Sequence, residues 1–145
     1  MAAETFRSVD IERTSVGRYV ARNVRGGTLE FGTGEPGDPN FTPVELLLTA
    51  IAGCTAADVD FIVSRRSEPT RFTVRSSGDK VRDDEGGNLM VDLAVEFTVT
   101  FPDGEAGDAA REALPRSVQM SHDRLCVVSR TVELGSPVTT TIAES

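Results

Sequence analysis

The chain has 145 residues, which is enough for a hydrophobic core that needs no disulfide or metal for stability. Its formal net charge of −8 argues against nucleic acid or an anionic membrane as a partner, because both bind clustered lysine and arginine. Two cysteines and one histidine, without a Cys-x-x-Cys pair, are too few ligands for a typical zinc site. We therefore expect one domain over residues 1–145, with no metal and no cofactor.

Targeting and membrane signals are also weak. The N-terminus lacks the basic region and apolar core of a secretory signal. The longest apolar run extends from about Val44 to Ala57, which is shorter than a bilayer span, and it contains Glu45. We expect a cytoplasmic protein with no membrane contact. In a reducing cytosol, two cysteines are more often catalytic, redox-sensing or simply buried than joined in a permanent disulfide.

The first predicted elements are short strands between residues 14 and 31. Residues 18–23 and 28–31 favour strands, and the Gly-Gly pair between them predicts a hairpin with its turn near Asn23 to Gly27. Residues 32–40 are rich in glycine, proline and polar side chains, which is typical of a loop.

A central helix follows this loop. Thr42 is the predicted N-cap, Pro43 occupies the first helical position, and Glu45 places a carboxylate in the first turn, where the helix dipole favours it. We expect the helix to end at about Arg66. Its first half is apolar on nearly all sides, so a sheet, a partner subunit or both must enclose it.

The remaining elements complete an α+β pattern. Apolar residues alternate with polar ones from Leu89 to Phe101, which predicts a long strand with one buried face, paired with a strand at residues 71–75. Residues 105–120 favour a second helix, kinked or restarted at Pro115. Residues 131–134 and 137–142 suggest a closing hairpin across Gly135. The predicted order is β-β-α-β-β-α-β-β.

The two cysteines are the main candidates for chemistry. Cys54 lies inside the apolar central helix, and Cys126 follows the second helix. If they meet in space, the two thiols can exchange electrons. The alternative is that both are structural, because a free cysteine is a good small core residue and Cys126 would then occupy a turn before a strand.

Two segments of the sequence carry a family resemblance. One is Phe41-Thr-Pro-Val-Glu-Leu-Leu-Leu-Thr-Ala-Ile-Ala-Gly-Cys-Thr-Ala-Ala-Asp-Val, and the other is Ser121-His-Asp-Arg-Leu-Cys-Val-Val-Ser-Arg. Together they resemble the OsmC/Ohr family over nearly the whole chain. The resemblance implies antiparallel sheets packed around a buried central helix in an intertwined homodimer. It also implies a thiol peroxidase that reduces organic hydroperoxides.

The resemblance further implies roles for four residues. Cys54 attacks the peroxide and becomes a sulfenic acid, which Cys126 resolves as a disulfide. An arginine and a glutamate assist, and Arg25 and Glu45 are the first choices here. A small dithiol or a dihydrolipoyl protein then restores the thiols. In this role Glu45 would hold the arginine through a bidentate ion pair, whereas its alternative role is that of a first-turn carboxylate.

Three departures from the family pattern place the chain in the OsmC-like branch. The position of the family glutamate is occupied by Val44, and Glu45 projects about 100° away around the helix. Val127 follows the second cysteine, where many members have proline. Arg18 and Arg22 compete with Arg25 for the role of the assisting arginine.

Other functions remain open from the sequence. A small-molecule-binding protein without efficient peroxidase activity would keep the fold and its apolar pocket, and a redox sensor would keep the thiols. His122 lies four residues before Cys126, so it suggests either a Cys–His nucleophile or a capping or surface role. Cys54 needs a neighbouring cation to become a thiolate, since burial alone raises the pKa of a thiol.

Overall fold

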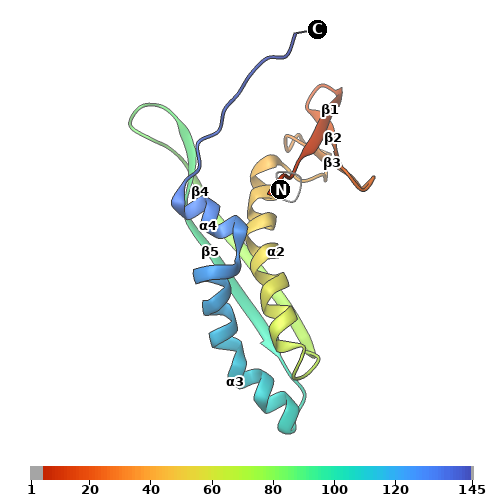
Figure 1. Ribbon diagram of the computed structural model, residues 1–145. Helices are drawn as coiled ribbons and strands as arrows, with labels where there is room; N and C mark the ends of the chain where they lie inside the picture. Colours follow the sequence, from red (N-terminus) through yellow and green to blue (C-terminus); the bar gives the residue numbers. More distant parts are fainter. Residues whose placement is uncertain (1–4, 145) are drawn as a thin grey trace. The chain divides into compact units, whose positions relative to one another are not determined.

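Figure 1 shows the computed structural model, which describes residues 5–144. The chain divides into two compact units, Met1–Leu47 and Leu48–Ser145. Antiparallel sheets and long helices give the predicted α+β class. The expectation of one domain stays a prediction.

The first unit contains a three-stranded antiparallel sheet in the order β1-β2-β3. Its strands are β1 (Val9–Ser15), β2 (Arg18–Asn23) and β3 (Thr28–Gly32). The predicted hairpin is confirmed as β2 and β3, and its rings Tyr19 and Phe31 stack with centroids 5.3 Å apart. Strand β1 was not predicted, because Val9 to Ser15 is exposed along its whole length and mixes apolar with charged residues.

The turn between β2 and β3 is held by one side chain. Asn23 Oδ1 accepts hydrogen bonds from the backbone N–H groups of Arg25 at 2.9 Å and Gly27 at 3.0 Å. Gly26 has a φ of 91°, which a residue with a Cβ rarely adopts. Arg25 is therefore at the exposed tip of this hairpin.

Helix α2 (Pro43–Val63) begins at the predicted residue. Glu45 Oε1 accepts from the Thr42 N–H at 2.8 Å, and the Glu45 N–H donates to Thr42 Oγ1 at 3.2 Å. This reciprocal pair is a capping box, which fixes the start of the helix. The helix ends at Val63 rather than near Arg66, and three turn residues follow it.

The length of α2 corrects the estimate made from its apolar run. At 21 residues, the helix is long and apolar enough to cross a membrane when length and composition alone are considered. The core helix of a soluble protein meets the same criterion, so the observation is weak evidence for a membrane span. Val59 and Val63, in its last turns, are fully buried within the second unit.

The second unit is built on a long antiparallel hairpin. Strand β4 (Arg71–Arg82) pairs with β5 (Asn88–Thr100), which confirms the strand predicted from the alternating pattern. The register shifts between Ser77 and Asp79, opposite Asp92, whose φ is +53°. This irregularity is a β-bulge. The side chains of β5 before and after it therefore do not follow one regular alternation between the two faces of the hairpin.

Helices α2 and α3 (Glu105–Met120) pack on one face of this hairpin (Figure 1). Helix α3 confirms the predicted second helix and contains Pro115. The core is formed by fully or nearly fully buried residues from both helices and from the position directly after β5, namely Val59, Val63, Phe101 and Ala110. Phe72, Phe97, Val99, Leu114 and Val118 pack around it.

The start of α3 has no room for a side chain at one position. A Cβ on Gly107, which is buried, would collide with the carbonyl oxygen of Pro102. The loop after β5 therefore runs directly against the first turn of the helix. Glycine at this position allows the close approach of the two backbones.

The predicted closing hairpin is wrong. After α3, a single π-helical turn η1 (Ser121–Leu125) leads to helix α4 (Val127–Leu134), and the described residues beyond it have no regular structure. The β-branched residues of α4 suggested a strand, but its apolar positions also recur at helical spacing. Gly135, interpreted as a hairpin turn, instead ends the helix with a φ of 71°.

Candidate functional site

The second unit brings the two cysteines together. Cys54, in the middle of α2, is half-buried, whereas Cys126, between η1 and α4, is fully buried. Both are free thiols, and they lie close enough for each to shift the pKa of the other. The two cysteines are far apart in the sequence but close in space, as electron exchange between their sulfur atoms requires.

Cys126 has a structural role that the sequence did not indicate: it is the N-cap of helix α4. Its backbone is extended, with φ −74° and ψ 100°, and its Sγ accepts a hydrogen bond from the Ser129 N–H at 3.4 Å. A second hydrogen bond joins Cys126 Sγ and Ser129 Oγ at 3.3 Å. The sulfur thus takes the place of the usual cap oxygen, beside the partial positive charge of a helix N-terminus.

The surroundings shift the two thiols in opposite directions. Burial raises the pKa of Cys54, and although a hydrogen bond with the backbone of Val128 opposes this, contact with Cys126 and the charge of Asp58 add to the increase. Burial also acts to raise the pKa of Cys126, but hydrogen bonds with the side chains of Ser129 and Thr55, with the Ser129 backbone and with Cys54 together lower it. A negative charge is therefore favoured on Cys126 over Cys54.

An ordered polar contact fixes η1 against α2 beside the pair. Ser121, fully buried, donates from Oγ to Asp58 Oδ2 at 2.8 Å. Asp58 lies one helical turn beyond Cys54 in α2. The hydrogen bond ties α2, which carries Cys54, to the helical turn that leads directly into Cys126.

His122 does not form a Cys–His pair. Its Nδ1 lies 3.1 Å from Asp123 Oδ1, and its Nε2 lies 3.0 Å from Glu133 Oε1. These two carboxylates raise the pKa of His122. The hydrogen bonds with Gln119 and His122 lower the pKa of Asp123. The imidazole is exposed and serves as a link between η1 and α4.

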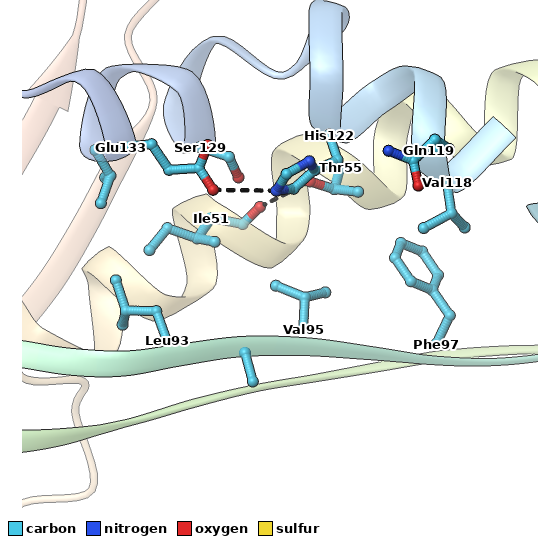
Figure 2. Close-up of a pocket in the computed structure, with 12 residues that line it drawn as sticks. Ile51, Thr55, Leu93, Val95, Phe97, Val118, Gln119, His122, Ser129 and Glu133 are labelled. Carbon is cyan, nitrogen blue, oxygen red and sulfur yellow. Dashed lines mark hydrogen bonds and ion pairs between the residues drawn. The ribbon is translucent and has the colours of Figure 1, made fainter. Parts of the chain in front are cut away.

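A cavity of about 480 Å³ lies next to the thiols, between α2, β5, α3, η1 and α4 (Figure 2). Two of its lining residues, Thr55 and Ser129, have side chains that lower the pKa of Cys126. Sequence reasoning missed both. The Cys-x-x-Ser spacing is the available signal for Ser129, because it matches the distance between an N-cap and the third helical residue.

Arg25 and Glu45 belong to the first unit, and their approach to Cys54 stays a prediction. Glu45 takes part in the capping box at the start of α2. Of the competing arginines, Arg18 lies 4.0 Å from the buried carboxylate of Asp38, and Arg22 lies 3.5 Å from Glu12. Among the described residues, no carboxylate forms an ion pair with Arg25.

No metal site was predicted from the sequence. Within residues 5–144, no group of three or more His, Cys, Asp or Glu side chains has an arrangement that could hold a metal ion.

Comparison with known proteins agrees with the resemblance seen in the sequence. The family model described as "OsmC-like protein" matches residues 33–141. An uncharacterised protein of Mycobacterium tuberculosis is 31% identical over 129 residues, which are 88% of this chain and 90% of that protein.

Solved structures share the fold at low sequence identity. An OsmC-like protein of unknown function from Vibrio cholerae aligns with a TM-score of 0.72 at 14% identity, covering 89% of this chain and 94% of that one. An organic hydroperoxide resistance protein of Bacillus subtilis aligns with a TM-score of 0.57 at 16% identity, covering 91% and 93% of the two chains. The match of the family model over most of the sequence and the identity to the mycobacterial protein lead to one conclusion: the chain belongs to the OsmC-like protein family.

Proposed function

We propose that this protein is a cysteine-based thiol peroxidase that reduces organic hydroperoxides to alcohols. The observation that carries the proposal is the proximity of Cys54 to Cys126, whose sulfur caps α4 and whose hydrogen bonds favour the thiolate in spite of burial. Membership of the OsmC-like family supports it, and so does the fold shared with an organic hydroperoxide resistance protein. We propose that the reaction takes place in the cytoplasm.

In the proposed reaction, Cys54 is the nucleophile because it is the more exposed of the two sulfur atoms. Cys126, as a thiolate, accepts the proton of Cys54. The Cys54 thiolate then attacks the distal oxygen of the hydroperoxide, the O–O bond breaks, and the alkoxide leaves as the alcohol after it takes up the proton held on Cys126, which becomes a thiolate again. Cys54 has lost two electrons and become a sulfenic acid.

The second proposed step closes the disulfide. Cys126, again as a thiolate, attacks Cys54 sulfur, and the sulfenic oxygen leaves as water once it is protonated. The sulfur atoms, which are not bonded in this structure, must approach to about 2.05 Å. A thiol reductant, either a small dithiol or a dihydrolipoyl protein, then supplies two electrons and two protons to restore both thiols.

Arg25 and Glu45 are proposed to assist this reaction. A guanidinium near Cys54 would stabilise its thiolate, which burial disfavours. Single replacement of Arg18, Arg22 and Arg25 by glutamine tests this choice: Arg25→Gln should lower kcat/KM for peroxide most. An equal or larger loss in Arg18→Gln or Arg22→Gln would reassign the arginine.

A homodimer is proposed as the active form. The face of α2 that carries Ala50, Ala57 and Phe61 is exposed in the described chain, and the C-terminal segment holding Val138 and Ile142 is exposed as well. A second copy of the chain, packed helix to helix, would bury this apolar surface. The extended segment at residues 137–142 would gain the strand partner that its sequence favours.

The oligomeric state tests this part of the proposal. Sedimentation should give a dimer for the native chain, and Ala57→Glu should shift it to the monomer because a carboxylate would be buried at the contact. Ala109→Glu, on an exposed position of α3, is the matched control. A native monomer, or equal effects of the two variants, would contradict the dimer.

The peroxidase itself is tested with cumene hydroperoxide on the reduced protein. Intact mass should show the loss of two hydrogens, and thiol titration the loss of both free thiols. Cys54→Ser should abolish peroxide consumption, whereas Cys126→Ser should allow one fast turnover and then stall. If Cys54 stays reduced, or overoxidises without engaging Cys126, the two-cysteine cycle is wrong.

The alternative function is a small-molecule-binding or redox-sensing protein without efficient peroxidase activity. One observation favours it: burial, Cys126 and Asp58 raise the pKa of Cys54, the proposed nucleophile. A thiol held in its protonated form reacts slowly. Two results together would establish this alternative. The protein would bind a ligand tightly, and its kcat/KM for peroxide would be no higher than the second-order rate constant of a small thiol in solution.

A further inference from the structure

The cavity beside the thiols has the size and walls of a small-ligand site. Its volume of about 480 Å³ lies within the 300–1,000 Å³ usual for such sites. In Figure 2, the side chains of Leu93, Val95 and Phe97 rise from β5 on one side, and His122 and Glu133 lie opposite them. Ile51, Val118 and Val132 add further apolar surface. A ligand here would have an apolar body.

The polar side of the cavity is acidic. Among the described lining residues, the ionisable side chains are His122 and Glu133. Both ring nitrogens of His122 are engaged by carboxylates, those of Asp123 and Glu133. Because these partners raise the pKa of His122, the group holds one positive charge against two negative charges when the imidazole is protonated.

After the hydrogen bonds within the protein are made, the groups of the cavity that remain for a ligand are mainly acceptors. Gln119 donates its Nε2 hydrogens to Asp123 Oδ1 at 2.9 Å and Oδ2 at 2.8 Å, so its amide oxygen remains. Glu133 uses Oε1 for His122, so Oε2 remains. Two acceptors and a net negative charge suit a ligand head that donates hydrogen bonds, whereas a carboxylate head would meet like charge and no free donor from His122.

We propose that this cavity binds an amphipathic small molecule whose apolar chain lies against β5 and whose uncharged or cationic head donates to Glu133 and Gln119, and that it discriminates against carboxylates. Thr55 and Ser129 line the cavity, Ser129 also hydrogen-bonds to Cys126, and Thr55 influences the pKa of Cys126. A bound molecule is therefore held next to the thiol pair. If the proposed peroxidase function holds, the site selects uncharged hydroperoxides over fatty-acid hydroperoxides; this last step rests on that function, but the binding preference does not.

Three probes with the same apolar chain test the preference: octylamine, 1-octanol and octanoate. Calorimetric titration into the reduced full-length protein should give the tightest binding for octylamine, weaker binding for octanol and the weakest for octanoate. Glu133→Gln should weaken octylamine binding about tenfold, which is the effect of one lost charge-assisted hydrogen bond, and should strengthen octanoate binding. Glu112→Gln removes an equal charge from an exposed position of α3 outside the cavity and should change neither affinity.

Filling the cavity is an independent test. Val95→Phe places a ring among the lining side chains and should weaken all three probes. Octanoate binding as tightly as octylamine, equal effects of Glu133→Gln and Glu112→Gln, or no binding of any probe would overturn the proposal. Cumene hydroperoxide consumption is measured on the same samples. Binding in the expected order without consumption would refute the peroxidase and leave the site intact, whereas consumption without probe binding would refute the site alone.

Discussion

Replacing Ser129 by alanine should make the Cys126 thiolate less stable. The substitution removes the hydrogen bond between Ser129 Oγ and Cys126 Sγ, whose atoms are 3.3 Å apart, and keeps the one from the Ser129 N–H at 3.4 Å. A hydrogen bond to a charged group contributes about 1.5 to 3 kcal/mol, and the long contact to sulfur favours the lower end. A loss of about 1.5 kcal/mol lowers the ratio of thiolate to thiol about tenfold at a given pH.

The assay isolates one sulfur atom. In a Cys54→Ser background, Cys126 is the only thiol of the chain, because the sequence has two cysteines. The ultraviolet absorbance of its thiolate is followed against pH, with the double variant Cys54→Ser/Cys126→Ser subtracted to remove the contribution of Tyr19. Ser136→Ala, exposed beyond α4, is the matched serine control.

The expected result is a titration displaced to higher pH in Ser129→Ala and unchanged in the control. A displacement to lower pH, or equal curves for the two serine variants, would refute the reasoning. In either case the hydroxyl of Ser129 would not be what stabilises the Cys126 thiolate.

Three further predictions concern the second unit. Val63→Ala should lower the free energy of unfolding by about 2 to 3 kcal/mol in urea denaturation, because Val63 is fully buried, whereas Val24→Ala at an exposed position should change it by less than about 0.5 kcal/mol; equal effects would contradict the core assignment. Gly107→Ala should cost about 1 to 3 kcal/mol in the same measurement, since its new Cβ meets the Pro102 carbonyl; an unchanged midpoint would show that the backbones are not in contact. His122→Gln should destabilise the protein most below pH 6.5, the ordinary value for histidine, and progressively less as the pH rises through the raised pKa of the folded state, where the imidazolium and its ion pairs are lost; a deficit that grows with pH would reverse the assigned sign.

The elements predicted well from sequence are those with strong local signals. The start of α2 follows from Thr42, Pro43 and Glu45, whose capping box involves only neighbouring residues. The long strand β5 follows from its alternating pattern, which reflects packing against helices on one face. In both cases the pattern that predicts the element is also the cause of its stability.

The elements predicted badly carry conflicting local signals or lack a partner. Residues 127–134 have the β-branched composition of a strand, but the Cys126 cap and the Gly135 ending favour a helix there. The segment at residues 137–142 has no strand partner within the described chain.

The candidate site was predictable only in part. The two cysteines were identified from their family motifs, but the cavity combines residues of five elements, and no periodicity or spacing reveals such a convergence. Thr55 and Glu133 contribute through the positions of their helices and carry no motif. The choice of the assisting arginine could not be predicted from a sequence pattern either, because Arg25 lies at the tip of a hairpin.

The sulfur of Cys126 has two roles that compete. It is the N-cap of α4, and it is the proposed partner of Cys54 in a disulfide. Once that sulfur is bonded to Cys54, it bears no negative charge to offer the first turn of the helix, and its direction is set by a covalent bond. Oxidation should therefore loosen the beginning of α4, and reduction should restore it. We therefore expect hydrogen exchange at the amide of Ser129 to be slower in the dithiol form than in the disulfide proposed here, so that this amide would report the redox state.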